Sequence, residues 1–201
     1  MSPYSRLDDE EAESPPMGEP NAFLEEALFK ARTILLTGGI DFKQAKRVCE
    51  RLLALSSANP KEPILLVISS PGGHVESGDM IHDMIKFVAA PVKVLGTGWV
   101  ASAGALIYAA AKKENRFALK NTRFLLHEPR GGVGGQATDV EIQAREILKM
   151  RERLNNIFAE ATGKSLEQIK KDTDRDFWMS ADEAVKYGLV SKIVTHQGEI
   201  K

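Results

Sequence analysis

The stretch Ile-Leu-Leu-Val-Ile-Ser-Ser-Pro-Gly-Gly, residues 64–73, decides the fold of this 201-residue chain. Its first five residues are apolar with no polar alternation, which is typical of a parallel strand buried on both faces. The Pro-Gly-Gly turn ends the strand. Ile81, Ile85 and Val88 then follow at helical spacing. The stretch therefore predicts a buried strand that a glycine turn connects to a helix.

The same alternation continues on both sides of this stretch. Upstream, Thr33 to Thr37 has the composition of a short strand, and Asp41 can cap the helix that follows. Downstream, a strand from Val92 to Leu95 precedes Gly96 to Gly98 and a small-residue helix from about Ala101 to Ala111. Strands and helices that alternate at this spacing predict repeated right-handed βαβ units and a largely parallel sheet, and so an α/β fold.

The second half of the chain contains fewer strand signals and one long helix. Phe124 to His127 is a short apolar strand, and a glycine-rich segment follows it. A helix is expected from about Val140 to Ala161. Its predicted apolar stripe consists of Val140, Ala144, Ile147, Leu154, Phe158 and Ala161. Two later helix starts are marked by capping boxes, Ser165 with Gln168 and Ser180 with Glu183.

Composition excludes several classes of function. The formal net charge is -1 with basic residues scattered among the acids, so no basic stripe is expected to bind nucleic acid. The apolar runs are far shorter than the ~20 residues of a membrane span. Residues 1–21 are acidic and contain prolines, which predicts a flexible tail or a pro-segment and not a secretory signal. We therefore expect a cytoplasmic protein with one folded domain at 22–195 and a C-terminal tail at 196–201.

Ser102 is the first candidate for chemistry. It lies where the turn Gly98 to Gly104 leads from a predicted strand into a helix. A hydroxyl exposed there, beside backbone N–H groups at a helix N-terminus, suits a reaction that forms an oxyanion. The alternative is that Ser102 only caps the helix. The surrounding residues do not form the G-x-S-x-G turn of α/β-hydrolases, so that motif lends no support.

His127 is the second candidate, because it closes a predicted strand. As a general base it must reach Ser102, and it needs a carboxylate on its other ring nitrogen to hold the useful tautomer. The alternative is a structural histidine. The spacing leaves four acids open as partners, namely Glu128, Asp172, Asp174 and Asp176.

The remaining polar candidates point to no further chemistry. Gly72 and Gly73 permit either close approach of a substrate or a simple tight turn. The other histidines, His74, His82 and His196, are expected to be structural or exposed. The chain has one cysteine, Cys49, in a helical run, where a buried inert thiol is expected over a reactive one. No spacing of His, Cys and Asp indicates a metal site.

Residues 23–194 resemble the proteolytic subunit of the Clp protease. The resemblance rests on six motifs in the family's order and at its spacing. They are SSPGG at 69–73, ASAGA at 101–105, HEP at 127–129, GGQATD at 134–139, DTDRD at 172–176 and MSA at 179–181. They occur across nearly the whole of the predicted folded domain.

The resemblance implies a serine endopeptidase with a Ser-His-Asp triad. Ser102 would be the nucleophile, His127 the general base, and Asp176 the acid that orients it. The backbone N–H groups of Gly73 and Ala103 would form the oxyanion hole. The segment Gly131, Gly132, Gly134, Gly135 and Gln136 would pair with an extended substrate as an added strand.

The resemblance also implies an assembly. The fold is the ClpP/crotonase-like fold with a protruding helix-strand handle, and the family stacks two heptameric rings around a chamber. Asp174 and Arg175 match the pair that couples ring contact to triad alignment. The chain would need no cofactor, because the ATP is used by a partner AAA+ ATPase, which unfolds the protein substrates.

The sequence departs from the family pattern at several positions, which suggests a divergent second isoform. Glu128 replaces the usual glutamine and could compete for His127 or raise its pKa. Ala103 replaces methionine, which matters little to a residue acting through its backbone. Leu65 and Val67 replace docking-pocket aromatics, and the usual axial loop is missing. We therefore expect ATPase docking to depend on a more typical paralogue in the opposite ring.

Two other functions fit parts of the pattern. The crotonase group shares the fold in outline and stabilises an enolate of a coenzyme A thioester with two backbone N–H groups, so an acyl-CoA enzyme is one alternative. A catalytically weak scaffold subunit in a mixed barrel is the other. Only the peptidase interpretation requires Ser102, His127 and Asp176 to act as a set.

Overall fold

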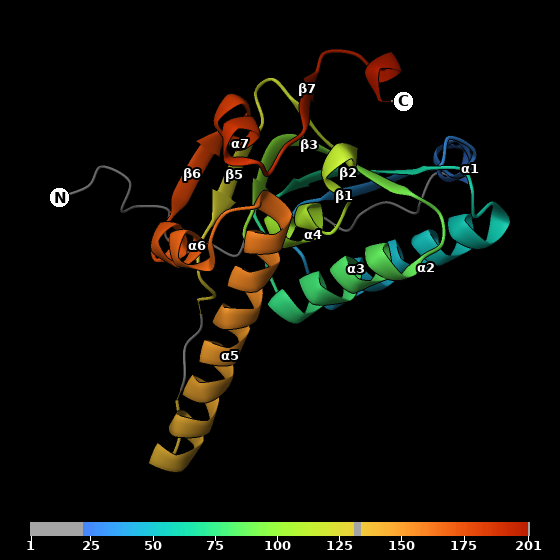
Figure 1. The fold of residues 1–201 in the computed structure, drawn as a ribbon. Coiled ribbons are helices and arrows are strands. Elements are labelled where there is room, and N and C mark those ends of the chain that lie inside the picture. The colour runs from blue at the N-terminus through green and yellow to red at the C-terminus, as the bar shows by residue number, and fades with distance from the viewer. Residues whose placement is uncertain (1–21, 131–133, 201) are drawn as a thin grey trace, which may run out of the picture.

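The computed structural model describes residues 22–130 and 134–200, which form a twisted sheet with helices packed against it (Figure 1). The helices are α1 Ala22–Lys30, α2 Phe42–Ala58, α3 Val75–Phe87, α4 Ala103–Ala109, α5 Ala137–Thr162, α6 Leu166–Thr173 and α7 Ala181–Tyr187. The strands are β1 Thr33–Thr37, β2 Ile64–Ser70, β3 Val92–Ala101, β4 Arg116–Leu119, β5 Arg123–Leu126, β6 Phe177–Ser180 and β7 Lys192–Val194. Two short 3₁₀ helices cover Lys113–Asn115 and Gln197–Glu199.

The sheet is largely parallel, as predicted for an α/β fold. Its main path runs β1-β2-β3-β4-β7, with every neighbouring pair parallel. β5 branches from β3, again in parallel, and β6 pairs antiparallel with β5. The carboxyl ends of β2, β3 and β5 therefore lie at one edge of the sheet, where ligands of α/β proteins bind.

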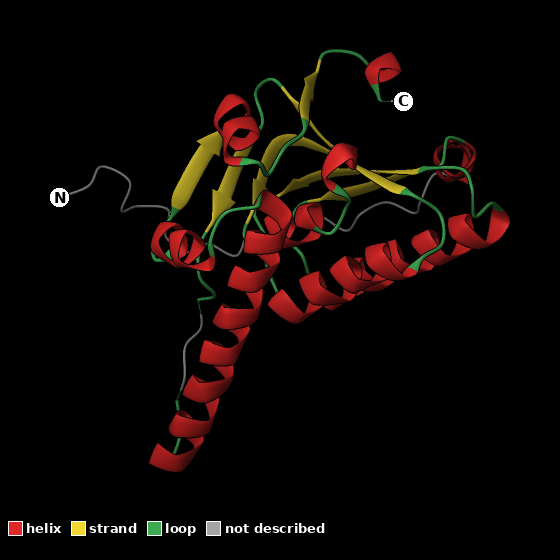
Figure 2. Cartoon of the chain, in the orientation of Figure 1, coloured by secondary structure: helices red, strands yellow, loops and turns green. Residues whose placement is uncertain are grey.

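Strand β2 is buried on one face only, so the predicted burial on both faces is wrong. Ile64, Leu66 and Ile68 have no exposed surface, whereas Leu65 and Val67 between them are only half-buried. The reason is that α2 and α3 lie along one side of the sheet (Figure 2). The alternate side chains point to the other face, which these helices do not cover.

Strand β3 is longer than predicted and is the branch point of the sheet. The expected break at Gly96 to Gly98 lies inside the strand, as an irregularity in the β2–β3 register between the pairs Ile68–Gly96 and Ser70–Val100. The strand pairs with β4 through Val94 to Gly96 and with β5 through Trp99 to Ala101.

Helix ends follow the capping signals. Asp41 accepts a hydrogen bond from the Gln44 backbone N–H at 2.7 Å, and Ser180 and Glu183 form a complete capping box. The box predicted at Ser165 is half-formed, because the side chain of Gln168 donates to Asp172 instead. The starts of α2, α6 and α7 are thus set by local sequence.

Helix α5 projects from the body of the molecule (Figure 1). The predicted apolar stripe is correct only in its second half, where Leu154, Phe158 and Ala161 are buried. Val140 and Ala144 in the first half are exposed, because that part extends beyond the sheet. The helical part of the predicted handle is therefore present.

Candidate active site

The register of the sheet places three predicted site residues at the ends of neighbouring strands. Ala101 pairs with Leu125 across β3 and β5, and Leu126 pairs with Phe177 across β5 and β6. Ser102 and His127 each come one residue after these strands. Asp176 comes one residue before the antiparallel β6. All three therefore meet at the same edge, in the order serine, histidine, aspartate.

His127 and Asp176 form a hydrogen-bonded pair. The distance from His127 Nδ1 to Asp176 Oδ1 is 3.0 Å, and the His127 side chain is 14% exposed. A carboxylate only accepts hydrogen bonds, so Nδ1 donates and Nε2 is left to accept a proton. This is the tautomer that a general base needs.

The other three candidate acids are occupied elsewhere. Asp172 accepts a hydrogen bond from the Tyr187 hydroxyl at 2.7 Å. Glu128 and Asp174 both lie beside Arg151, and neither contacts His127. The competition of Glu128 for the imidazole, which the sequence suggested, is therefore not observed. Asp176 is the acid that the strand pairing brings to His127.

Arg130 is a neighbour of the site that sequence analysis missed. Its guanidinium donates to the same oxygen of Asp176 that accepts from His127. The arginine follows Glu128 and Pro129 in the chain, and no local pattern distinguishes it from an exposed arginine of a loop. Its contact depends on the β5–β6 pairing, which brings Asp176 near.

Ser102 has a strained backbone. Its φ of 54° and ψ of -121° are rare for a residue with a side chain, and such strain clusters at functional sites. Ser102 occupies the cap position of α4, but its hydroxyl makes no capping hydrogen bond. The purely structural interpretation of Ser102 as a cap thus loses its main support.

The serine and the histidine are not yet hydrogen-bonded. Among the residues that the structure describes, no hydrogen bond connects the Ser102 hydroxyl to His127. The Ser102 backbone N–H donates to Leu125 O at 3.0 Å, which fixes the start of α4 against β5. In unliganded enzymes the bond between nucleophile and base is often long and tightens only with substrate bound.

The two glycines after β2 pack against the serine and against Ile40. A Cβ on Gly72, at φ 99°, would lie 2.6 Å from Ser102 Cβ. A Cβ on Gly73, at φ 148°, would lie 2.3 Å from Ile40 O. No other residue type fits these positions without a backbone shift. The tight turn that the sequence offered as one alternative is therefore present, and the close approach of a substrate stays a prediction.

Two backbone donors are available near Ser102. Ile40 N donates to Gly72 O and His74 N donates to Ile40 O, which directs the N–H of Gly73 away from Ile40. Within the described residues, neither Gly73 N nor Ala103 N has an assigned acceptor. An oxyanion hole needs two such unengaged donors beside the nucleophile.

The glycine-rich segment is not a strand where it is described. Gly134, Gly135 and Gln136 have irregular backbone, and Gln136 directly precedes α5. Gly131 and Gly132 lie outside the described residues. The strand half of the predicted handle is thus not formed by residues 134–136.

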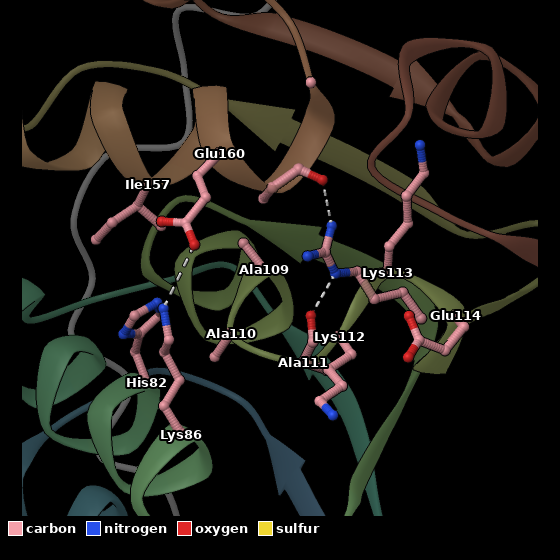
Figure 3. A pocket seen from close by; sticks show the side chains of 13 residues that line it. His82, Lys86, Ala109, Ala110, Ala111, Lys112, Lys113, Glu114, Ile157 and Glu160 are labelled. Carbon is pink, nitrogen blue, oxygen red and sulfur yellow. Dashed lines mark hydrogen bonds and ion pairs between the residues drawn. The ribbon is translucent and has the colours of Figure 1, made fainter.

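A pocket of about 410 Å³ lies away from these residues, between α3, α4 and the end of α5 (Figure 3). None of the predicted site residues lines it. Arg116 donates to Ala111 O and Ala161 O, each at 2.7 Å, and Lys86 lies 3.9 Å from Glu160. Arg116 and Lys86 are therefore engaged with groups of the protein itself, and Lys112, Lys113 and Glu114 complete the charged lining.

The other singled-out side chains are structural. His82 is buried, and its Nδ1 is hydrogen-bonded to Asp83 Oδ1 at 2.9 Å. The Nδ1 of His74 is hydrogen-bonded to Ser77 Oγ at 2.9 Å. Cys49 is buried, and burial together with the charge of Glu50 raises the pKa of its thiol to about 11. That thiol stays protonated near neutral pH and is a poor nucleophile.

Neither a metal nor a membrane is indicated by the described part of the chain. Residues 22–130 and 134–200 contain no group of three or more His, Cys, Asp or Glu side chains that could hold a metal ion. Across the same ranges, no helix has the length and apolar character needed to cross a bilayer.

An apolar hollow of about 320 Å³ lies on the uncovered face of the sheet. Leu65 and Val67 line it with Leu95, Leu119 and Val194, which come from three neighbouring strands. The two positions where the sequence departs from docking-pocket aromatics thus share one hollow. Thr33, Thr195, His196, Gln197 and Ile200 complete its lining, which contains no Phe, Tyr or Trp of the described residues.

The fold and the site define an α/β protein whose serine, histidine and aspartate are ordered as in serine hydrolases. The Clp protease family model matches residues 18–197. The chain is 58% identical to the ATP-dependent Clp protease proteolytic subunit 3 of Rhizobium etli over 192 residues, 96% of this chain and 97% of that protein. The chain therefore belongs to the Clp protease family.

Two further comparisons agree. The ATP-dependent Clp protease proteolytic subunit 2 of Gluconobacter oxydans is 57% identical over 201 residues, covering 99% of this chain and 88% of that protein. A solved structure of a ClpP1 mutant from Listeria monocytogenes superposes with a TM-score of 0.83 at 53% identity. That match covers 89% of this chain and 99% of the solved one.

Proposed function

We propose that this chain is a serine endopeptidase subunit that hydrolyses peptides and, with an AAA+ ATPase, unfolded proteins in the cytoplasm. The observation that carries the proposal is the strand register that aligns Ser102, His127 and Asp176 at one sheet edge. The hydrogen bond from His127 Nδ1 to Asp176 supports the assigned roles. The peptidase domain of this proposal spans residues 22–195.

The proposed reaction follows from these atoms. Ser102 Oγ attacks the peptide carbonyl while His127 Nε2 removes its proton, and Asp176 stabilises the imidazolium that forms. The N–H groups of Gly73 and Ala103 donate to the developing oxyanion. His127 then gives the proton to the leaving amine. Water hydrolyses the acyl-enzyme by the same steps in reverse, which restores Ser102.

The substrate is proposed to bind as an added strand. The segment Gly131, Gly132, Gly134, Gly135 and Gln136 offers backbone with almost no side chains, so main-chain hydrogen bonds would provide the affinity. Such binding gives weak side-chain specificity. It also fits a protease that must process many unfolded sequences.

A serine-directed fluorophosphonate probe tests the proposed chemistry. We expect the probe to label the purified protein on Ser102, as mass spectrometry of the labelled peptide would show. A crotonase-like acyl-CoA enzyme needs no activated serine and would not be labelled. Absence of labelling in the folded, assembled protein would reject the peptidase proposal.

The proposed assembly is a barrel of stacked heptameric rings, with Asp174 and Arg175 linking ring contact to triad alignment. Asp174 lies 3.6 Å from Arg151 of its own chain, and Arg175 has no assigned ion pair within residues 22–130 and 134–200. An unengaged guanidinium supports a contact with another subunit. The paralogue and the ATPase are further partners in this proposal.

We expect degradation of an unfolded protein to depend on a paralogue. Large aromatic side chains often dominate interface energetics, and none of the described Phe, Tyr or Trp residues lines the hollow around Leu65 and Val67. The measurement is ATP-dependent degradation with the cognate ATPase, before and after adding the paralogue. Equal rates would refute the dependence. A mixed barrel whose rate is unaffected by Ser102→Ala would identify a scaffold subunit.

A further inference from the structure

Arg151 of α5 bridges the two segments that carry His127 and Asp176. Its Nε lies 2.9 Å from Glu128 Oε2, and its Nη2 lies 3.6 Å from Asp174 Oδ1. Glu128 directly follows His127, and Asp174 comes two residues before Asp176. One guanidinium therefore contacts a residue next to His127 and a residue close to Asp176 in the chain.

A second set of contacts joins the same two segments. The Glu128 backbone N–H donates to Thr173 O at 2.8 Å, and the buried Thr173 hydroxyl shares its proton between Ile169 O at 2.8 Å and Asn155 Oδ1 at 3.0 Å. Asn155 lies four residues after Arg151 and thus on the same face of α5. Helix α5 therefore holds the segment before Asp176 at two points one turn apart.

The charges explain why a guanidinium is needed there. Without Arg151, the carboxylates of Glu128 and Asp174 would lose the cation that they share. The Glu128 carboxylate would then be free to turn toward the imidazole of His127. The Arg151 side chain is 35% exposed, so the ion pairs are partly shielded from solvent. A planar guanidinium can hold two carboxylates in fixed directions.

We propose that Arg151 is a positioning residue. Through Glu128 and Asp174, it holds the side chains of His127 and Asp176 in the hydrogen-bonded arrangement that catalysis needs. The proposal rests on the proposed peptidase function. In this proposal, Glu128 is the carboxylate that pairs with Arg151 within the same subunit. Glutamate at position 128 and arginine at position 151 act as a matched pair.

The test compares Arg151→Met with a control on the same helix. Methionine keeps much of the apolar stem and removes both ion pairs. We expect kcat for a short fluorogenic peptide to fall about 10-fold at unchanged KM, because sub-ångström misplacement of a base slows chemistry more than binding. The control is Arg153→Met, since Arg153 pairs with Asp79, away from the site. Its kcat should stay within about 2-fold of the wild type.

A rescue separates positioning from general destabilisation. In the Arg151→Met background, Glu128→Gln removes the carboxylate left without its arginine, so we expect kcat to recover most of the loss. A merely structural defect would not be repaired by this change. Sedimentation velocity and thermal unfolding would be recorded for each variant.

The outcomes separate this inference from the proposed function. If Ser102→Ala hydrolyses the peptide as fast as the wild type, the peptidase function fails and Arg151 loses its role with it. If Ser102→Ala is inactive, three results would overturn the inference alone. They are an unchanged kcat in Arg151→Met, an equal loss in Arg153→Met, or a loss that follows disassembly and is not rescued by Glu128→Gln.

Discussion

Ser102→Ala is expected to lower peptide hydrolysis by on the order of 10⁴-fold or more while leaving fold and assembly intact. Alanine keeps the Cβ, so the strained backbone at φ 54° costs the same in both proteins. The hydroxyl makes no capping hydrogen bond whose loss would weaken α4. The measurement is hydrolysis of a fluorogenic peptide, with sedimentation velocity as the check on assembly.

The companion variants test whether the three residues act as one unit. His127→Ala should lose about as much activity as Ser102→Ala, and the double variant little more, because removing either member disables the same step. Additive losses would argue against a shared mechanism. Hydrolysis near the wild-type rate in Ser102→Ala would remove the serine from its proposed role.

Gly73→Ala is expected to reduce kcat by about 10²- to 10³-fold, the usual cost of losing one oxyanion donor. A methyl group there would stand 2.3 Å from the Ile40 carbonyl oxygen, at a φ of 148° that residues with side chains rarely adopt. Because both obstacles are backbone, the Gly73 N–H itself must move. KM should change much less, since the donor acts mainly in the transition state.

Gly163→Ala provides the matched control for backbone strain. Gly163 ends α5 at φ 75°, and an added Cβ would meet no atom within 4 Å. This variant should lose about 1 kcal/mol of unfolding free energy, measured by urea denaturation, and keep its kcat. If the kcat of Gly73→Ala equalled that of Gly163→Ala, the N–H of Gly73 would not be an oxyanion donor.

The α/β fold could be predicted because its signals are local. Continuous apolar runs mark strands and helical spacing marks helices, so β1, β2, α2 and α3 follow from short windows of sequence. The sequence does not predict β4, β6 and β7, although it predicts β5, because strands of three or four residues carry too little pattern to be identified consistently. The one-sided burial of β2 could not be read from its own residues, since it depends on where the helices pack.

The residues of the candidate site could be picked from the sequence one by one, but their arrangement could not. Ser102 and His127 stand out because each follows a strand, whereas spacing could not select Asp176 from four acids. That choice requires the pairing of Leu126 with Phe177, and hence the missed strand β6. The contacts of Arg130 and Arg151 depend on the same tertiary arrangement. No sequence window contains them.

The antiparallel strand β6 also fixes when a growing chain can acquire its site. Ser102 and His127 are synthesised well before Asp176. About fifty residues separate β5 from β6, the strand that places the Asp176 carboxylate beside His127. Contacts between segments so far apart in sequence form late, after local helices and neighbouring strands. A nascent subunit on the ribosome therefore has a serine and a histidine but no oriented base. In the proposed mechanism, His127 is therefore oriented as a base only after β6 has paired with β5.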